Sequence, residues 1–310
     1  LQKHDFFGYS VDISNDYAII GSYGYNSKRG KVYFYKKTSS NWELNTEITL
    51  EQCEINSCFG ISVSIYNNYA LVGAHKQYNG RVYLLTLKND TWEIISTLTS
   101  PDNITDELFG KSIDLSKKYI IIGAPGTDMY RKLHTGNVYI YKYTHSDVEF
   151  LMKLSPSDSM VYAFPNFGDT VKINNKYAVI GHNLSRLFKG TVYIFHLQNE
   201  HWTELATLTS NDSEKSDYFG NSIDIYNNYI IIGANWENTY KGSAYLYTFD
   251  KTKLKWIMIK KFIRDDDIRN IGDNYAKSVS ISHNNILIST YNTDNQSSIL
   301  SYSLIGGNIK

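Results

Sequence analysis

Two cysteines, Cys53 and Cys58, have the clearest potential for covalent chemistry, and four residues separate them. A close cysteine pair in one short loop favours a disulfide that staples the loop, which would indicate an oxidising compartment. The same spacing is also compatible with two free thiols. A zinc site is disfavoured, because no second pair of cysteine or histidine ligands lies at a suitable spacing.

Three consecutive aspartates, Asp265–Asp267, are a candidate cation site. Calcium needs about 6–8 oxygen ligands, and three adjacent side chains do not converge on one ion, so a solvated acidic loop is the favoured interpretation. The eight histidines are scattered along the chain, and the sequence contains no hydrolase, metalloprotease or phosphate-loop motif. We therefore expect a protein that is not an enzyme and has no metal and no cofactor.

A repeat that runs through the whole sequence sets the positions of these residues. Five copies open with Phe-Gly and a degenerate sixth opens with Tyr-Ala, at spacings of 50 to 58 residues. The copies start at Phe7, Phe59, Phe109, Phe167, Phe219 and Tyr275. A fixed period of about this length indicates stacked or radially arranged units. We expect a single domain that spans residues 1–310.

Each copy predicts four short antiparallel strands. In the second copy, Ser62–Ile65 alternates polar and apolar residues, two asparagines form a turn, and Tyr69–Gly73 gives the second strand. A Gly-x-Val-Tyr strand follows, and the fourth strand begins near a tryptophan, which Phe150 replaces in the third copy. Such units are the blades of a β-propeller. The sequence therefore predicts an all-β fold with six blades, or seven if the chain is incomplete.

The order Phe-Gly-x-Ser, Gly-Ala and Gly-x-Val-Tyr resembles the FG-GAP repeat of the integrin α-subunit propeller, over essentially the whole chain. The Gly-Ala pairs stand at residues 73–74, 123–124 and 233–234. The resemblance implies a rigid propeller that presents loops for adhesion or protein binding. It does not extend to the calcium loops of that family, because only a tight turn such as Asn67-Asn68 joins the first two strands here.

Binding is expected where the long loops lie, because long loops on a rigid scaffold commonly carry binding residues. The loops after each second strand are mostly basic and the loops between repeats mostly acidic, so one interpretation is that they only pair with each other. The alternative is a contact patch for a protein or a glycan, built from aromatic and basic residues of the types enriched at hot spots. Its predicted members are Tyr130, Arg131, Lys132, Arg186, Phe188, Trp236 and Tyr240.

Five glycosylation sequons are compatible with the secretory pathway. They stand at Asn89, Asn103, Asn183, Asn211 and Asn295. The formal net charge is zero, which gives no indication of nucleic acid binding, and no apolar run approaches the ~20 residues of a membrane helix. The first residue is Leu1, which points to a chain that is processed, truncated or part of a longer protein.

These features predict a non-enzymatic interaction or adhesion module that is extracellular or attached to the cell surface. Two alternatives stay open. The first is a structural subunit of a larger, intracellular assembly. The second is a carbohydrate-active enzyme with a site on the propeller axis, because propellers can bring catalytic groups together from several blades.

Overall fold

The computed structural model describes residues 4–51, 53–126, 136–144, 147–157, 166–210, 217–237, 241–263, 274–291, 297–305 and 308–309. The described chain forms six four-stranded antiparallel sheets, each in chain order. This confirms the predicted all-β fold, a six-blade β-propeller. Two compact units, residues 1–155 and 156–310, hold three blades each. The single-domain organisation stays a prediction.

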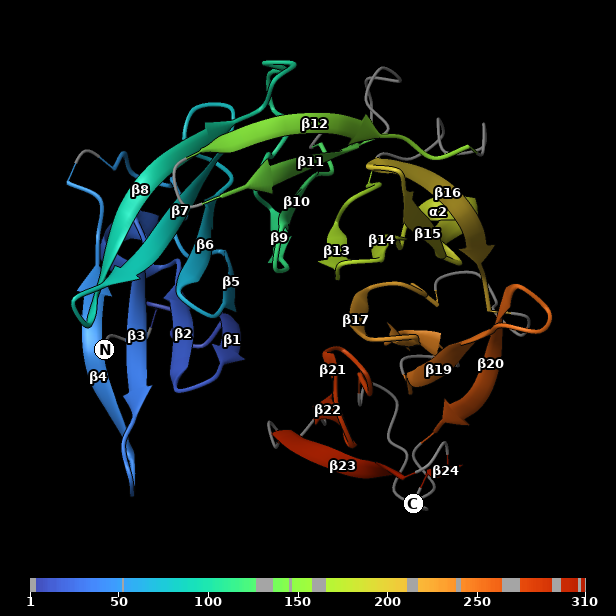
Figure 1. Ribbon diagram of the computed structural model, residues 1–310. Coiled ribbons are helices and arrows are strands. Elements are labelled where there is room, and N and C mark those ends of the chain that lie inside the picture. Colours follow the sequence, from blue (N-terminus) through green and yellow to red (C-terminus); the bar gives the residue numbers. More distant parts are fainter. Residues whose placement is uncertain are drawn as a thin grey trace. The chain divides into compact units, whose positions relative to one another are not determined.

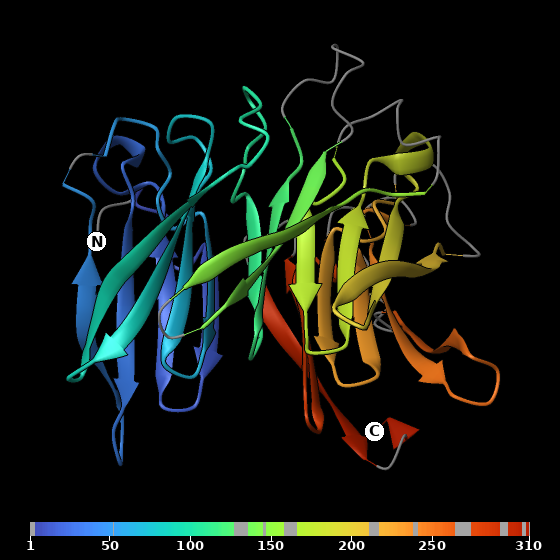
Figure 2. The ribbon, with the colours of Figure 1, turned by 45° about the horizontal axis from the view of Figure 1, so that its top comes forward.

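The first unit contains blades 1 to 3. Its strands are β1 (Ser10–Ser14), β2 (Tyr17–Ser22), β3 (Lys31–Lys37), β4 (Trp42–Ile48), β5 (Ser62–Tyr66), β6 (Tyr69–Ala74), β7 (Arg81–Lys88), β8 (Thr91–Thr99), β9 (Ser112–Leu115), β10 (Tyr119–Ala124), β11 (Asn137–Tyr143) and β12 (Val148–Leu154). Figure 1 shows the four strands of blade 2, β5 to β8, side by side in this order. In Figure 2, the tight hairpin turns of blades 1 and 2 lie together at one end of the strands.

The second unit contains blades 4 to 6. Its strands are β13 (Thr170–Ile173), β14 (Tyr177–His182), β15 (Thr191–Gln198), β16 (His201–Leu208), β17 (Ser222–Tyr226), β18 (Tyr229–Ala234), β19 (Ser243–Asp250), β20 (Lys255–Phe262), β21 (Val279–Ser282), β22 (Asn285–Tyr291), β23 (Ser297–Ile305) and β24 (Asn308–Ile309). Two single helical turns, α1 (Tyr25–Lys28) and α2 (Ser185–Phe188), lie in the loops after the second strands of blades 1 and 4.

Asparagine shapes the tight turns between first and second strands. Asn15 and Asn67 have φ angles of 53° and 52°, left-handed values that asparagine tolerates better than most residues. The turn at Lys117–Lys118 has the same length, because Ser116 N donates to Tyr119 O at 2.9 Å and only the two lysines lie between them.

The hydrophobic core lies between neighbouring blades. Phe34 of blade 1 packs in one cluster with Val72 of blade 2, and Leu84 of blade 2 packs in the next cluster with Ile122 of blade 3. Equivalent clusters lie between blades 4 and 5 and between blades 5 and 6. A blade therefore buries its faces by stacking on its neighbours, as repeat proteins do.

The phenylalanine of the Phe-Gly pair is completely buried in blades 2 to 5. Phe59 packs edge-on against Tyr83 with ring centroids 5.5 Å apart, and Phe219 packs in the same way against Tyr245 at 5.4 Å. Each tyrosine belongs to the third strand of the same blade. An aromatic contact of this kind, favourable beyond its buried area, thus holds the start of the blade against its third strand.

Glycine ends the second strand because the backbone of the next blade lies against it. A Cβ atom at Gly73 would overlap the carbonyl oxygen of Gly110, which belongs to the Phe-Gly pair of blade 3. Ser62 Oγ donates a hydrogen bond of 2.7 Å to the same oxygen. The equivalent bond from Ser10 to Gly60 is 2.9 Å long. We call this arrangement of serine, second-strand glycine and Phe-Gly carbonyl the Phe-Gly joint.

The glycine before the third strand has a related function. Gly30 has a φ angle of +93°, in the left-handed region that favours glycine, and a Cβ atom there would overlap the carbonyl oxygen of Phe59. Blade 6 differs from the other five, because its ladder places Ser289 where they have the second-strand glycine. The serine and glycine residues of the repeat motif therefore lie at the surfaces where one blade contacts the next.

Candidate binding surfaces

The predicted contact patch is only partly covered by the described residues. Tyr130, Arg131, Lys132 and Tyr240 lie outside them, and Arg186 is described only by its backbone position in α2. The side chains of Phe188 and Trp236 are described, and both are half-buried. The patch as a whole stays a prediction, while these two residues can be placed.

An aromatic cluster joins Phe188 and Trp236 through a third ring, Tyr218. The rings of Phe188 and Tyr218 are stacked with centroids 5.8 Å apart, and Tyr218 lies 4.6 Å from Trp236. Backbone bonds fix the arrangement, because Tyr218 N donates to Phe188 O at 2.9 Å and Phe219 N donates to Lys189 O at 3.1 Å. We call these three residues the loop-end cluster. Sequence reasoning missed Tyr218, although it directly precedes a Phe-Gly pair.

Several acidic loop residues are buried and do not form an exposed rim. Glu237 is 6% exposed and accepts hydrogen bonds from Tyr245 Oη at 2.6 Å and from Lys261 Nζ at 2.5 Å. Glu107 is 3% exposed and accepts hydrogen bonds from Tyr139 and Asn137. These carboxylates therefore hold their loops onto the third strands, where buried charges need such partners.

Cys53 and Cys58 are buried free thiols, with no bond between them. Cys53 Sγ donates to Arg29 O and Cys58 Sγ donates to Asn56 O, each at 3.3 Å. Burial raises the pKa of both thiols, which lowers the fraction present as reactive thiolate. The predicted disulfide stays a prediction.

The three described sequons differ in exposure. Asn89 and Asn103 are exposed. Asn183 is 5% exposed, and its amide nitrogen donates to Asp169 at 3.2 Å and to Asn221 at 3.4 Å. A glycan on that nitrogen would break these bonds, so the folded structure favours Asn89 and Asn103. Asn211 and Asn295 lie outside the described residues.

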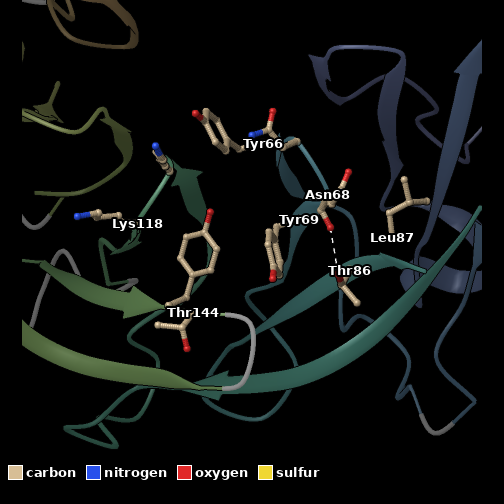
Figure 3. Close-up of a pocket in the computed structure, with 10 residues that line it drawn as sticks. Tyr66, Asn68, Tyr69, Thr86, Leu87, Lys118 and Thr144 are labelled. Carbon is tan, nitrogen blue, oxygen red and sulfur yellow. Dashed lines mark hydrogen bonds between the residues drawn. The ribbon is translucent and has the colours of Figure 1, made fainter. Parts of the chain in front are cut away.

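A groove of about 640 Å³ lies between blades 2 and 3, at the hairpin-turn end of the strands and not at the predicted loop end. It is lined by Tyr66, Asn67, Asn68, Tyr69, Thr86, Leu87, Lys117, Lys118, Tyr143 and Thr144. Figure 3 shows Tyr69 and Thr86 on one side of the groove and Lys118 and Thr144 on the other. Its volume falls within the range of typical ligand sites.

Blade 3 has no tryptophan at the position that Trp92 occupies in blade 2. The ladder pairs Leu87 with Trp92 in blade 2 and Tyr143 with Val148 in blade 3, so Val148 occupies the tryptophan position. The prediction that Phe150 replaces this tryptophan is wrong. Phe150 lies two residues further along the strand, where it pairs with Tyr141.

The intact arrangement is visible in two other blade pairs. Between blades 1 and 2, Trp92 stacks on Phe34 at 4.5 Å and meets Tyr17 edge-on at 5.6 Å. Between blades 4 and 5, Trp256 meets Tyr177 edge-on at 5.1 Å. In the groove, Tyr69 stands at the position of Tyr17 and Tyr177. Here the ring in contact with that tyrosine is Tyr143 of the third strand, not a tryptophan of the fourth strand.

The lining of the groove is aromatic, polar and basic. Tyr143 meets Tyr69 edge-on with ring centroids 5.1 Å apart, and its hydroxyl donates to Ser116 O at 2.7 Å. Burial raises the pKa of Tyr143, with smaller effects from Tyr69 and Tyr66, so the phenol stays protonated. No acidic residue lines the groove, and Lys117 and Lys118 form no ion pair with any described residue.

Acidic residues on the first strands connect neighbouring blades. Asp12 accepts hydrogen bonds from Ile65 N at 2.8 Å and Ser64 Oγ at 3.2 Å, both in blade 2. Asp224 makes the equivalent bond to Ile281 N at 2.8 Å. These carboxylates have structural partners, and the described ranges contain no group of three His, Cys, Asp or Glu side chains that could hold a metal ion. Asp265–Asp267 lie outside those ranges.

Comparison with known proteins identifies the repeat. The FG-GAP repeat family matches residues 2–35, 92–141 and 202–247. The crystal structure of Sqt1 from Saccharomyces cerevisiae is similar over 96% of this chain and 86% of that chain, with a TM-score of 0.51 and 11% sequence identity. That similarity shows the fold alone, and no curated protein sequence matches the chain.

Each family match contains a Phe-Gly pair together with the third strand that its phenylalanine contacts or precedes. In the structure these residues build the joints between blades, and the blades themselves are six four-stranded antiparallel sheets. The described helices are single turns, far shorter than a bilayer-spanning helix. The sequence matches and the blade architecture agree, and together they support an FG-GAP repeat β-propeller.

Proposed function

We propose that this propeller is a non-enzymatic interaction module whose loop ends bind another protein. FG-GAP propellers are generally not enzymes, are usually extracellular, and have a fold suited to protein binding. The proposal places this chain outside the cell or on its surface, in agreement with its exposed sequons at Asn89 and Asn103. Adhesion is the corresponding biological role.

The loop-end cluster is the observation that carries this proposal. Phe188, Tyr218 and Trp236 come from three separate loop segments, and their rings are in contact and half-buried. Tyrosine and tryptophan dominate the energetics of many interfaces, because each offers a large rigid surface with a polar edge. A cluster held by backbone bonds is ordered before binding, which lowers the entropic cost of association.

Site-specific photo-crosslinking tests the proposal. A benzophenone amino acid at Tyr218 of the full chain should crosslink to one discrete partner when the protein is returned to its native source. The same probe at Leu254 is the control, because Leu254 is 73% exposed in the hairpin turn at the other end of blade 5. Equal crosslinking from both positions would contradict a specific loop-end surface.

Alanine substitutions give a second readout with a matched control. Trp236→Ala should weaken partner capture at least tenfold, as expected for a hot-spot tryptophan worth about 2 kcal/mol. Trp42→Ala is the control, since Trp42 is 39% exposed in blade 1 and belongs to the opposite, hairpin-turn end of the strands. Loss of capture in both variants would indicate a general effect on folding.

A further inference from the structure

The groove between blades 2 and 3 carries positive charge that the described residues do not neutralise. Lys117 and Lys118, in the turn between β9 and β10, are exposed and form no ion pair with any described residue. By contrast, Lys36 of blade 1 pairs with Asp90 at 2.6 Å. Asp147 lies close to the groove in sequence but is not part of its lining, and it accepts a hydrogen bond of 2.9 Å from the backbone N–H that follows it. The two ammonium groups are therefore available to a negatively charged ligand.

Tyrosine rings provide the flat surfaces of the groove. Tyr66 and Tyr69, on either side of the turn between β5 and β6, are half-buried, and Tyr143 meets Tyr69 edge-on with ring centroids 5.1 Å apart. The negative face of such a ring attracts the slightly positive hydrogens of C–H groups. Leu87 is the single aliphatic side chain among the lining residues. The groove therefore differs from the apolar pocket in which a peptide anchor is usually buried.

Neutral polar groups of the lining have unused hydrogen-bonding capacity. The hydroxyl of Tyr66 and the side-chain amide of Asn68 have no hydrogen-bond partner among the described residues. Asn67 Oδ1 accepts a bond of 2.9 Å from Asn15 Nδ2, which leaves the amide N–H groups of Asn67 free to donate. Figure 3 shows Asn68 beside Thr86, whose hydroxyl donates to the backbone oxygen of Asn68 at 3.1 Å and not to its side chain. Hydroxyl and amide groups of this kind can both donate to and accept from the hydroxyls of a ligand.

We propose that this groove binds an acidic saccharide, a sugar ring that carries one carboxylate. Such a ligand combines an apolar C–H face, several hydroxyls and one negative charge, and the lining offers a counterpart to each. The C–H face packs on the ring of Tyr69, the hydroxyls bond to Tyr66 and Asn68, and the carboxylate pairs with Lys117 or Lys118. A groove of about 640 Å³ has room for one or two sugar rings. This site is distinct from the loop-end cluster, since it lies at the hairpin-turn end of blades 2 and 3.

A matched pair of sugars tests the requirement for the carboxylate. Methyl β-glucuronide and methyl β-glucoside differ only at C6, which is a carboxylate in the first and a hydroxymethyl group in the second. Each is titrated against the full chain and followed by saturation-transfer NMR of the sugar. We expect a dissociation constant of roughly 0.1–3 mM for the glucuronide, a weak affinity suited to one small anchor, and binding of the glucoside at least fivefold weaker. The methyl glycoside of N-acetylneuraminic acid is titrated in parallel, and the tighter of the two acidic sugars identifies the saccharide as a uronic or a sialic acid.

Substitutions in the protein locate the site. The double variant Lys117→Gln, Lys118→Gln should weaken binding of the acidic sugar at least fivefold, to the level of the glucoside, and remove its dependence on salt. Tyr66→Phe keeps the ring and removes only the hydroxyl, so it should weaken binding of both sugars about threefold. Lys251→Gln is the control, since Lys251 is an exposed lysine in the turn between β19 and β20 of blade 5 and should leave the dissociation constants unchanged.

The results separate this proposal from others. Equal affinity for the matched sugars, unchanged binding in the double lysine variant, or no binding of either acidic sugar at ~10 mM would overturn it. Acetate that binds as tightly as the glucuronide would show a simple anion site, and N-acetyl-aspartate methylamide that does so would show a site for an acidic peptide. Either result would also overturn the assignment to a saccharide. The ligand comparisons use the unchanged protein, so the test holds even if a variant does not fold.

Discussion

At the Phe-Gly joint, the backbones of two neighbouring blades approach so closely that only glycine fits at the end of the second strand. The carbonyl oxygen of Gly110 lies where a Cβ of Gly73 would be. The overlap involves backbone on both sides, so no side-chain rotation can relieve it. Ser62 donates a hydrogen bond to the same oxygen, which fixes the orientation of that carbonyl group as well as its distance from blade 2.

Gly73→Ala is therefore expected to destabilise the protein by about 2–4 kcal/mol, the cost of forcing extra volume into a packed site. Urea denaturation followed by tyrosine and tryptophan fluorescence measures this change. Ser289→Ala is the control at the same strand position of blade 6, because it adds no volume and removes only the 2.8 Å hydrogen bond from Ser278 N to Ser289 Oγ, which should cost about 1 kcal/mol. Equal effects of the two variants would refute the backbone argument.

His75 is the second residue with a measurable individual effect. It is 7% exposed, its Nδ1 has no hydrogen-bond partner among the described residues, and Lys111 and Lys76 lie near it. Burial, assisted by the two lysines, lowers the pKa of His75 to about 3. Between about pH 6.5 and pH 3, the His75 imidazole is therefore neutral in the folded protein, whereas in the unfolded chain it takes up a proton.

The sign of the pH effect follows from that difference. Below about pH 6.5 the unfolded chain binds a proton that the folded protein does not, so stability falls with decreasing pH by about 1.4 kcal/mol per unit until pH 3. Between pH 7 and pH 5, His75→Asn should lose about 2 kcal/mol less stability than the unchanged protein. Urea midpoints at the two pH values measure this, with the exposed His201→Asn as control. Identical pH dependence in all three proteins would contradict a buried neutral His75.

At the scale of the strand, the tryptophan position of the fourth strand differs between blades 2 and 3. Trp92 packs edge-on beside Tyr17, whereas Val148 stands at this position in blade 3 and Tyr143 meets Tyr69 instead. Because Trp92 is 2% exposed, its burial between blades 1 and 2 should contribute strongly to stability.

The reverse substitution tests this relation. Trp92→Val should cost about 3–5 kcal/mol, because it removes a nearly completely buried ring and leaves a cavity between blades 1 and 2. Trp42→Val, at the equivalent but 39% exposed position of blade 1, should cost no more than about 1 kcal/mol. Thermal or urea unfolding of both variants makes the comparison, and similar losses would show that burial of this position has no special importance.

The strands could be predicted because their signals are local. Alternation at Ser62–Ile65 and the asparagines in the turns are properties of neighbouring residues, and the structure confirms them. The tryptophan position of blade 3 could not be predicted in the same way. It falls on Val148, and the sequence alone placed it at Phe150 because sequence does not fix the ladder register. The contact of Tyr218 with Trp236 depends on two loops that sequence does not place together.

For the molecule as a whole, the cellular compartment determines both whether the two cysteines are oxidised and whether the sequons carry glycans. If the chain is secreted, mass spectrometry of protein purified from its native source without reduction should find glycans on Asn89 and Asn103, none on Asn183, and a Cys53–Cys58 bond. The exposure difference among the three asparagines is the internal control. Free thiols, no glycans and a stoichiometric set of partner proteins would instead favour the intracellular assembly subunit.

Among the described residues, three hydrogen bonds of the Phe-Gly joint connect residues at nearly the same separation along the chain. The separations are 50 residues for Ser10 and Gly60, 48 for Ser62 and Gly110, and 54 for Ser222 and Ala276. A blade therefore has its complete docking surface as soon as the following Phe-Gly pair has been synthesised. At about 5–20 residues per second, the ribosome would release one new joint roughly every 3–10 s, so that assembly can proceed blade by blade from the N-terminal end while the rest of the chain is still being made.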